Sequence, residues 1–98
     1  MIVRFTSDAE ADLESIGDYI ARDNPARAVS FVQELQACCL ELASLPHAWP
    51  LVLRYEEHGI RRRVYGDYLV FFRPDFETVT VLRVLHGATD FAAVIGQP

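Results

Sequence analysis

The stretch Gly59-Ile-Arg-Arg-Arg-Val-Tyr-Gly-Asp-Tyr-Leu-Val-Phe-Phe-Arg-Pro74 decides the fold of this chain. It is followed closely by Thr78-Val-Thr-Val-Leu-Arg-Val-Leu-His-Gly87. Both segments are rich in β-branched and aromatic residues, and Gly-Asp and Pro-Asp pairs interrupt them as turn signals. The pattern predicts three consecutive strands in the second half of the chain.

The first half predicts a short strand and two helices. Residues 2–6 alternate as a strand does, and Ser7-x-x-Glu10 then reads as a capping box with the serine as N-cap. Apolar residues recur at helical spacing to about Arg22. Asn24-Pro25 is a good N-cap followed by proline at the first helical position, and a wide apolar stripe continues from there to Leu45.

The resulting order is β-α-α-β-β-β, which predicts an α+β fold in which a helical hairpin packs on one face of a mostly antiparallel sheet. With 98 residues, the chain is expected to be a single domain over residues 1–98. The tail at residues 90–95 is expected to form a short helix that packs on the sheet or contacts a partner.

The expected turns assign the two faces of the sheet. A two-residue loop at Gly66-Asp67 pairs Tyr65 with Tyr68, and a turn headed by Asp75-Phe76 pairs Tyr68 with Arg83. The face expected to lie under the helices carries Ile60, Val64, Leu69, Phe71, Leu82 and Val84. The opposite face is predicted to stay open and to bind a partner through Arg61, Arg63, Tyr65, Tyr68, Val70, Phe72 and Arg83.

Composition supports a partner-binding protein. Hydrophobic residues make up 51% of the chain and the mean hydropathy is +0.11, so a small domain is expected to leave apolar surface for a partner. Every basic residue is arginine, and the formal net charge is −5. That balance argues against strong nucleic-acid binding by the chain alone. The use of arginine without lysine has two explanations. Arginine suits bidentate or stacked contacts with a defined partner, and a GC-rich genome also favours arginine codons over lysine codons.

No motif indicates a metal or cofactor. The adjacent Cys38 and Cys39 suit neither a disulfide with each other nor a metal site with His47, His58 or His86. They are expected to be small core residues in a reducing cytoplasm. No signal peptide is apparent, and no run approaches the length of a membrane span.

The complete pattern resembles the ParE branch of the RelE/ParE superfamily, the toxins of type II toxin–antitoxin modules. The matching segments span nearly the whole domain in the right order: Ala11-Asp-Leu-Glu-Ser-Ile16 with Asp18-Tyr-Ile20, Asn24-Pro-Ala-Arg-Ala28, Arg61 to Val70, Phe72-Arg73, and Val81-Leu-Arg-Val-Leu-His-Gly87. The resemblance implies a cytoplasmic toxin of the plasmid-stabilization type, neutralised by a small ParD-like antitoxin.

Two activities occur in this superfamily, and the resemblance leaves both open. RelE-like members cut messenger RNA in the ribosomal A site, and here the candidate residues for that chemistry are Arg61, Arg63, Arg83 and His86. Tyr68 and Ala88-Thr89 stand where that subgroup has arginines, and Val94-Ile95 where it has a tyrosine. These departures favour the ParE activity, binding and blocking DNA gyrase, for which no catalytic residue is expected. A degenerate module that binds its antitoxin without toxicity is the third alternative.

Overall fold

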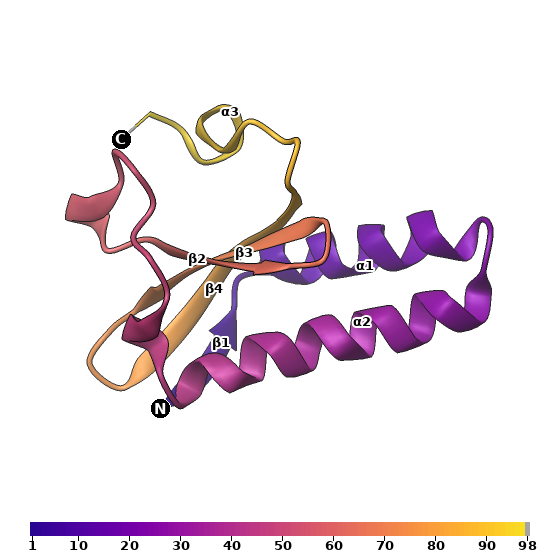
Figure 1. The fold of residues 1–98 in the computed structure, drawn as a ribbon, viewed down its shortest axis with the longest axis horizontal. Coiled ribbons are helices and arrows are strands. Elements are labelled where there is room, and N and C mark those ends of the chain that lie inside the picture. Colours follow the sequence, from indigo (N-terminus) through magenta and orange to yellow (C-terminus); the bar gives the residue numbers. More distant parts are fainter. Residues whose placement is uncertain (98) are drawn as a thin grey trace.

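The computed structural model describes residues 1–97, in which a helical hairpin and a four-stranded sheet pack together (Figure 1). The α+β architecture is as predicted. The helices and strands, in chain order, are β1 (Ile2–Phe5), α1 (Ser7–Ala21), α2 (Pro25–Leu40), β2 (Arg61–Tyr65), β3 (Tyr68–Pro74), β4 (Thr78–His86) and α3 (Phe91–Ile95). Short 3-10 turns at Glu41–Ala43, Pro46–Ala48 and Glu56–His58 occupy the connection between α2 and β2.

The sheet is mixed, with strand order β1-β4-β3-β2. The strands β2, β3 and β4 form an antiparallel meander, whereas β1 pairs in parallel with β4 through Ile2–Thr78 to Phe5–Val81. The last strand therefore lies beside the first, and the connection between these two parallel strands consists of the helical hairpin followed by β2 and β3.

Helix starts follow the expected capping chemistry with one shift. The N-cap of α1 is Thr6, whose hydroxyl accepts a hydrogen bond from the Ala9 amide at 3.0 Å, so the prediction of Ser7 was wrong by one residue. Thr6 also donates to the Leu82 carbonyl of β4, a second contact that fixes it as the cap. The N-cap of α2 is Asn24, as predicted, and its side chain accepts from the Arg27 amide.

The prediction of which sheet face lies under the helices was wrong. The main core joins α1 and α2 to Val70 and Phe72, which had been expected on the open face, and to Val79 and Val81 of β4, and none of these four has exposed surface. These four side chains are adjacent on the two central strands, β3 and β4, and form a continuous apolar surface. Two helices that pack on this surface remove it from water. Of the residues expected under the helices, Val84 does lie in this core. Three polar side chains beside this core bond to groups of the helices: Arg63, Tyr65 and Arg83.

The register between β3 and β4 also differs from the prediction. The β2–β3 pairing is as expected, with Tyr65 opposite Tyr68. The next turn lies one residue later than expected, because the Asp75 amide donates to the Thr78 carbonyl and Pro74 pairs with Val79. A bulge then places an extra residue in β4, so that Tyr68 faces His86 rather than Arg83. The bulge reverses the alternation of β4 beyond it.

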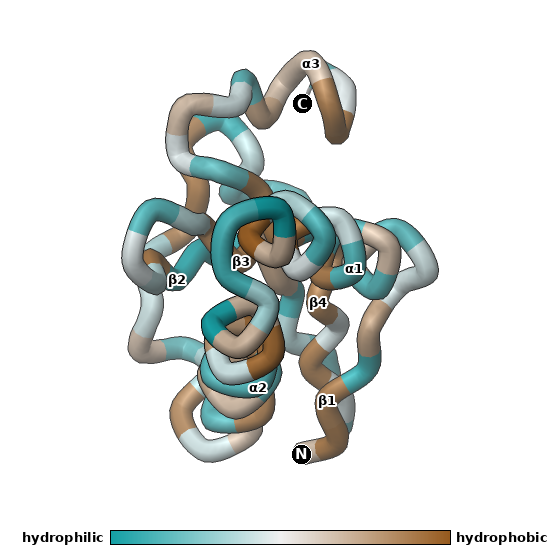
Figure 2. The backbone as a smooth tube through the Cα atoms, turned by 90° about the vertical axis from the view of Figure 1, so that its right-hand side faces the viewer, coloured by the Kyte–Doolittle hydropathy of each residue, from teal (hydrophilic) through white to brown (hydrophobic). Residues whose placement is uncertain are grey.

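The far side of the sheet, hereafter the outer face, has its own smaller core. Tyr55, Ile60, Phe71 and Leu85 are buried there, and α3 packs over them through Phe91, whose ring stacks on that of Phe71 with 3.9 Å between centroids. Figure 2 shows α2 and α3 on opposite sides of the strands. The tail therefore packs on the sheet, one of the two placements expected for it.

Candidate partner-binding site

Arg63 points toward α2 rather than toward open solvent. Its Nη1 donates to the Cys38 carbonyl at 2.9 Å and lies 3.2 Å from a carboxylate oxygen of Glu41. The guanidinium also stacks over the Trp49 ring at 4.7 Å from the centroid. The last carbonyls of a helix lack partners within the helix and attract cations. Arg63 thus fastens the end of α2 to the sheet.

This contact predicts a stability effect that distinguishes Arg63 from its neighbour. Arg63→Ala should lower the free energy of unfolding by about 1–2 kcal/mol, because a largely buried charged hydrogen bond and the packing on Trp49 are lost. Arg62→Ala is the matched control, since Arg62 is exposed on the other face of the same strand, and should change stability by less than about 0.5 kcal/mol. Urea denaturation measures both, and equal effects would contradict the placement of Arg63.

Arg61, Tyr65 and Tyr68 also contact the helix side. Arg61 donates to the Trp49 carbonyl at 2.6 Å and to that of His47 at 3.3 Å. Tyr65 donates its hydroxyl to Glu34 of α2 at 2.8 Å, and this hydrogen bond raises the pKa of the tyrosine. Tyr68 packs its ring against Phe31, 5.6 Å between centroids. These side chains hold the hairpin of β2 and β3 against α2.

Arg83 contacts α1, whereas the sheet residues described above contact α2 or the loop that follows it. Its Nε and Nη2 donate to the two carboxylate oxygens of Asp12 at 2.7 and 2.8 Å, and the same carboxylate accepts the Val84 amide at 2.9 Å. The hydrogen bond to Asp12 raises the pKa of Arg83. Because β1 ends at Phe5, Asp12 satisfies an amide of β4 beyond the last β1 pair.

The residues predicted for phosphodiester cleavage do not gather in one place. Arg61 and Arg63 meet at Trp49, whereas Arg83 is held by Asp12. His86 is exposed at the end of β4, and its Nδ1 accepts the Ala88 amide at 3.1 Å. An enzyme that stabilises phosphorane charge and transfers protons needs such groups around one reacting atom. This arrangement gives little support to the nuclease alternative.

The cysteines lie where the sequence places them, in the core. Cys38 and Cys39 are free and buried in α2. Burial raises the pKa of the Cys39 thiol to about 12, so it is almost entirely protonated at neutral pH. Within residues 1–97, no group of three His, Cys, Asp or Glu side chains is placed to hold a metal ion. None of the helices in the same range combines the length and apolar character that a membrane span requires.

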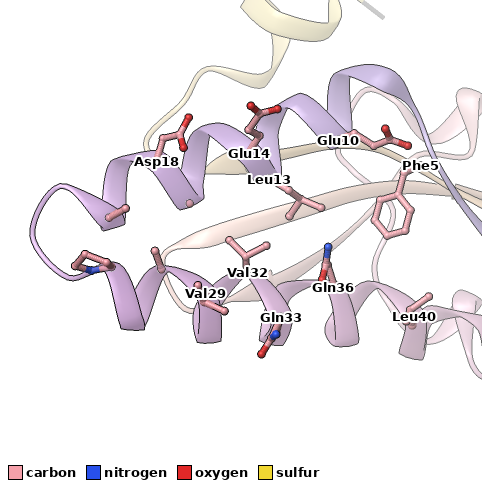
Figure 3. Close-up of a pocket in the computed structure, with 14 residues that line it drawn as sticks. Phe5, Glu10, Leu13, Glu14, Asp18, Val29, Val32, Gln33, Gln36 and Leu40 are labelled. Atoms are coloured by element: carbon pink, nitrogen blue, oxygen red, sulfur yellow. The ribbon is translucent and has the colours of Figure 1, made fainter.

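An open groove with a volume of about 1020 Å³ lies between α1 and α2 (Figure 3). Leu13 from α1 and Val32 from α2 point into the space between the helices. The helices approach closely at Gly17, where a Cβ atom would lie 3.2 Å from the Val32 side chain. A larger residue at this position would push the helices apart and change the shape of the groove.

The two sides of the groove differ in chemistry. The α1 side has a row of carboxylates from Glu10, Glu14 and Asp18 (Figure 3). The α2 side has two exposed apolar side chains, Val29 with 61% and Leu40 with 57% of its surface accessible. Apolar surface beside charge of one sign is typical of a surface that binds an amphipathic segment of opposite charge.

Sequence reasoning missed this groove. The acidic residues of the first helix are typical of a solvated helix face. Val29 does not belong to the apolar stripe of α2, and the sequence alone gives no reason to assign it a role. The available signal was that Val29 and Leu40 fall away from the buried positions of that helix, such as Leu35 and Cys39. An apolar residue off the buried stripe is weak evidence alone, because single exposed apolar residues are common.

Comparisons with known proteins agree with the resemblance found in the sequence. The model of a family described as the ParE toxin of the type II toxin-antitoxin system, parDE, matches residues 3–91. The chain therefore belongs to the ParE toxin family. No curated protein sequence matches it.

Two solved structures have the same fold. One is the chromosomal ParDE toxin–antitoxin system from P. aeruginosa, with a TM-score of 0.74 and 22% identity, covering 88% of this chain and 95% of that one. The other is the RelBE2 toxin–antitoxin complex from Mycobacterium tuberculosis, with a TM-score of 0.65 and 28% identity, covering 87% and 95%.

Proposed function

We propose that this ParE-family toxin is neutralised by a cognate ParD-like antitoxin whose amphipathic segment docks in the groove between α1 and α2, and that its target is DNA gyrase. Membership of the ParE family and the toxin–antitoxin complexes among its structural relatives support the antitoxin. The observation that supports the docking site is the groove itself, with exposed Val29 and Leu40 on its α2 side and a row of carboxylates on its α1 side.

The groove defines the chemistry of the antitoxin segment. The helix α1 has 15 residues, about 22 Å at 1.5 Å per residue, so a helix of about 15 residues would run along its whole length. Its buried side should be apolar, to cover Val29 and Leu40. Its edge toward α1 should carry Lys or Arg, to pair with Glu10, Glu14 and Asp18.

Other sheet residues are weaker candidates for the antitoxin contact. A partner-binding role for Arg61, Arg63, Tyr65, Tyr68, Val70, Phe72 and Arg83 stays a prediction. Val70 and Phe72 have no exposed surface, so a partner could reach them only after the helices moved. The polar groups of Arg61, Arg63, Tyr65 and Arg83 already contact the helices or the adjoining loop, and Tyr68 packs its ring against Phe31.

The groove makes a direct prediction. Val29→Arg should weaken antitoxin binding at least about 30-fold, since an interface position of this kind is worth about 2 kcal/mol and the new charge repels a basic segment. The antitoxin to use is the product of the small open reading frame expected beside this gene. Ala37→Arg is the control, because Ala37 is an exposed position of α2 outside the groove. Titration calorimetry measures both, and equal weakening would contradict the site.

Gyrase as the target rests on the family together with the dispersed arrangement of the nuclease candidates. The purified toxin should inhibit supercoiling by gyrase, and its induction without antitoxin should cause filamentation and a DNA-damage response. Prompt translational arrest with cut messages and unaffected gyrase would instead support the RelE-type activity. Normal growth with verified soluble toxin would support a degenerate module. The proposal places the protein in the cytoplasm, where gyrase acts.

A further inference from the structure

The outer face of the sheet presents three arginines beyond the area that α3 covers. Arg4 of β1 and Arg73 of β3 both pair with Thr80 of β4, so the three residues form one row across neighbouring strands. Arg62 of β2 pairs with Phe71, two residues before Arg73, and is its diagonal neighbour. All three arginines are exposed. We call Arg4, Arg62 and Arg73 the arginine patch.

Strand alternation fixes the side on which the patch lies. Val3 and Phe5 pack into the main core, so Arg4 between them points outward. Phe71 belongs to the outer core, and Arg73 and Arg62 share its face. The patch is therefore on the opposite side of the sheet from the groove between α1 and α2.

The patch lacks counter-charges within the chain. Among residues 1–97 the arginines in ion pairs are Arg27, Arg63 and Arg83, and the three arginines of the patch make none. Arg4 and Arg73 are two strands apart, about 10 Å between their Cα atoms. In a protein with a net charge of −5, three unpaired arginines on one face form a local field that attracts carboxylates or phosphates.

Apolar side chains adjoin the patch and favour a polypeptide as its ligand. Ile2 lies on the same face of β1 two residues before Arg4, and 67% of its surface is exposed. Phe76, at the turn between β3 and β4, is 90% exposed and lines a shallow hollow with Met1, Ile2 and Glu77. A nucleic-acid backbone offers Ile2 only sugar C–H groups between charged phosphates, whereas a polypeptide can place a whole apolar side chain on it. The net negative charge of the chain also opposes a long polyanion more than a short acidic segment.

We propose that the outer face binds an extended acidic segment of a partner protein. Its carboxylates pair with the guanidinium forks of Arg4, Arg62 and Arg73, and an apolar side chain of the segment covers Ile2 and Phe76. The site is distinct from the proposed antitoxin groove, and both can be occupied at once because the sheet separates them. It gives the toxin a second partner surface.

The test uses the intact protein and a fluorescein-labelled peptide of alternating Glu-Glu and Leu-Leu pairs, so that each face of the extended peptide carries both residue types. A length of about ten residues suffices to cross the four-stranded sheet, at roughly 4.8 Å per strand. Fluorescence anisotropy at about 50 mM and about 150 mM salt should show saturable binding that weakens with salt. The same peptide with Gln in place of Glu, and a single-stranded DNA of matched length, are measured beside it.

The double variant Arg4→Gln with Arg73→Gln should weaken binding of the Glu-Leu peptide about tenfold or more, because two charged contacts are lost. Arg22→Gln with Arg27→Gln removes the same charge from the far end of the helical hairpin and should change binding less than about twofold. All four side chains are exposed, and unchanged melting temperatures check the folds.

Three outcomes would overturn the proposal. The first is the absence of saturable binding of the Glu-Leu peptide. The second is an equal loss in both double variants, which would mean that only net charge matters. The third is tighter binding of the DNA than of the peptide through Arg4 and Arg73, which would make the ligand a nucleic acid. None of these depends on whether the antitoxin groove or gyrase inhibition is correct.

Discussion

Replacement of Phe72 by alanine is expected to destabilise the fold by about 3–5 kcal/mol, the cost of removing a fully buried aromatic ring from a core. Phe72 has no exposed surface and lies where α1, α2 and the centre of the sheet meet. For a domain of this size the melting temperature should fall by roughly 10–30 °C. The loss is expected because Phe72 faces the helices and does not belong to an open binding face.

Phe76→Ala supplies the control with the same change of side chain. Phe76 is 90% exposed at the turn between β3 and β4, so its removal should change stability by less than about 0.5 kcal/mol. Calorimetric melting of both variants makes the comparison. If the Phe72 variant had the same melting temperature as the wild type, the Phe72 ring would not lie in the core, and the assignment of the sheet faces would be reversed.

Replacement of Asp12 by alanine is expected to cost about 3 kcal/mol, the second largest effect. The carboxylate accepts two hydrogen bonds from Arg83 and one from the Val84 amide, and both charged side chains are mostly buried. Its removal leaves a mostly buried guanidinium and a strand amide without partners, and an unpaired buried charge is strongly destabilising. Chemical denaturation measures the change.

Two further variants separate this effect from general changes in α1. Asp18→Ala removes an exposed carboxylate from the same helix and should change stability by less than about 0.5 kcal/mol. Asp12→Ala combined with Arg83→Met should be more stable than Asp12→Ala alone, because no unpaired charge remains. A double variant that loses the full sum of two separate effects would show that Asp12 and Arg83 act independently.

The sequence was sufficient to predict the elements and their order, since local signals determine them. Asn24-Pro25 has the chemistry of a helix start, and Gly66, with a φ of 57°, adopts the left-handed conformation that a tight hairpin needs. The β2–β3 register followed from that turn. The start of α1 was uncertain by one residue because Thr6 and Ser7 are nearly equivalent caps, and only a contact with distant Leu82 favours Thr6.

The faces of the sheet could not be predicted from the same signals. Both faces alternate apolar and charged residues, and the arginines favoured an open surface only while their partners were unknown. Arg63 and Arg83 point toward the helices because they bond there to the carbonyl of Cys38 and the carboxylate of Asp12. Both partners are distant in sequence from the arginines that they bind. The bulge after Val81 leaves no clear trace in the sequence. The candidate groove depends on how two helices pack, so it too was absent from the predictions.

The parallel contact between β1 and β4 has a consequence for synthesis of the protein. Thr6 bonds to a carbonyl 76 residues further along, and α1 depends on the same late strand through Asp12. Such long-range pairing forms late, because closing a large loop costs entropy before any contact compensates for it. A nascent chain cannot complete its sheet until β4 has left the ribosome. A fragment that ends before β4 therefore lacks the final shape of the protein.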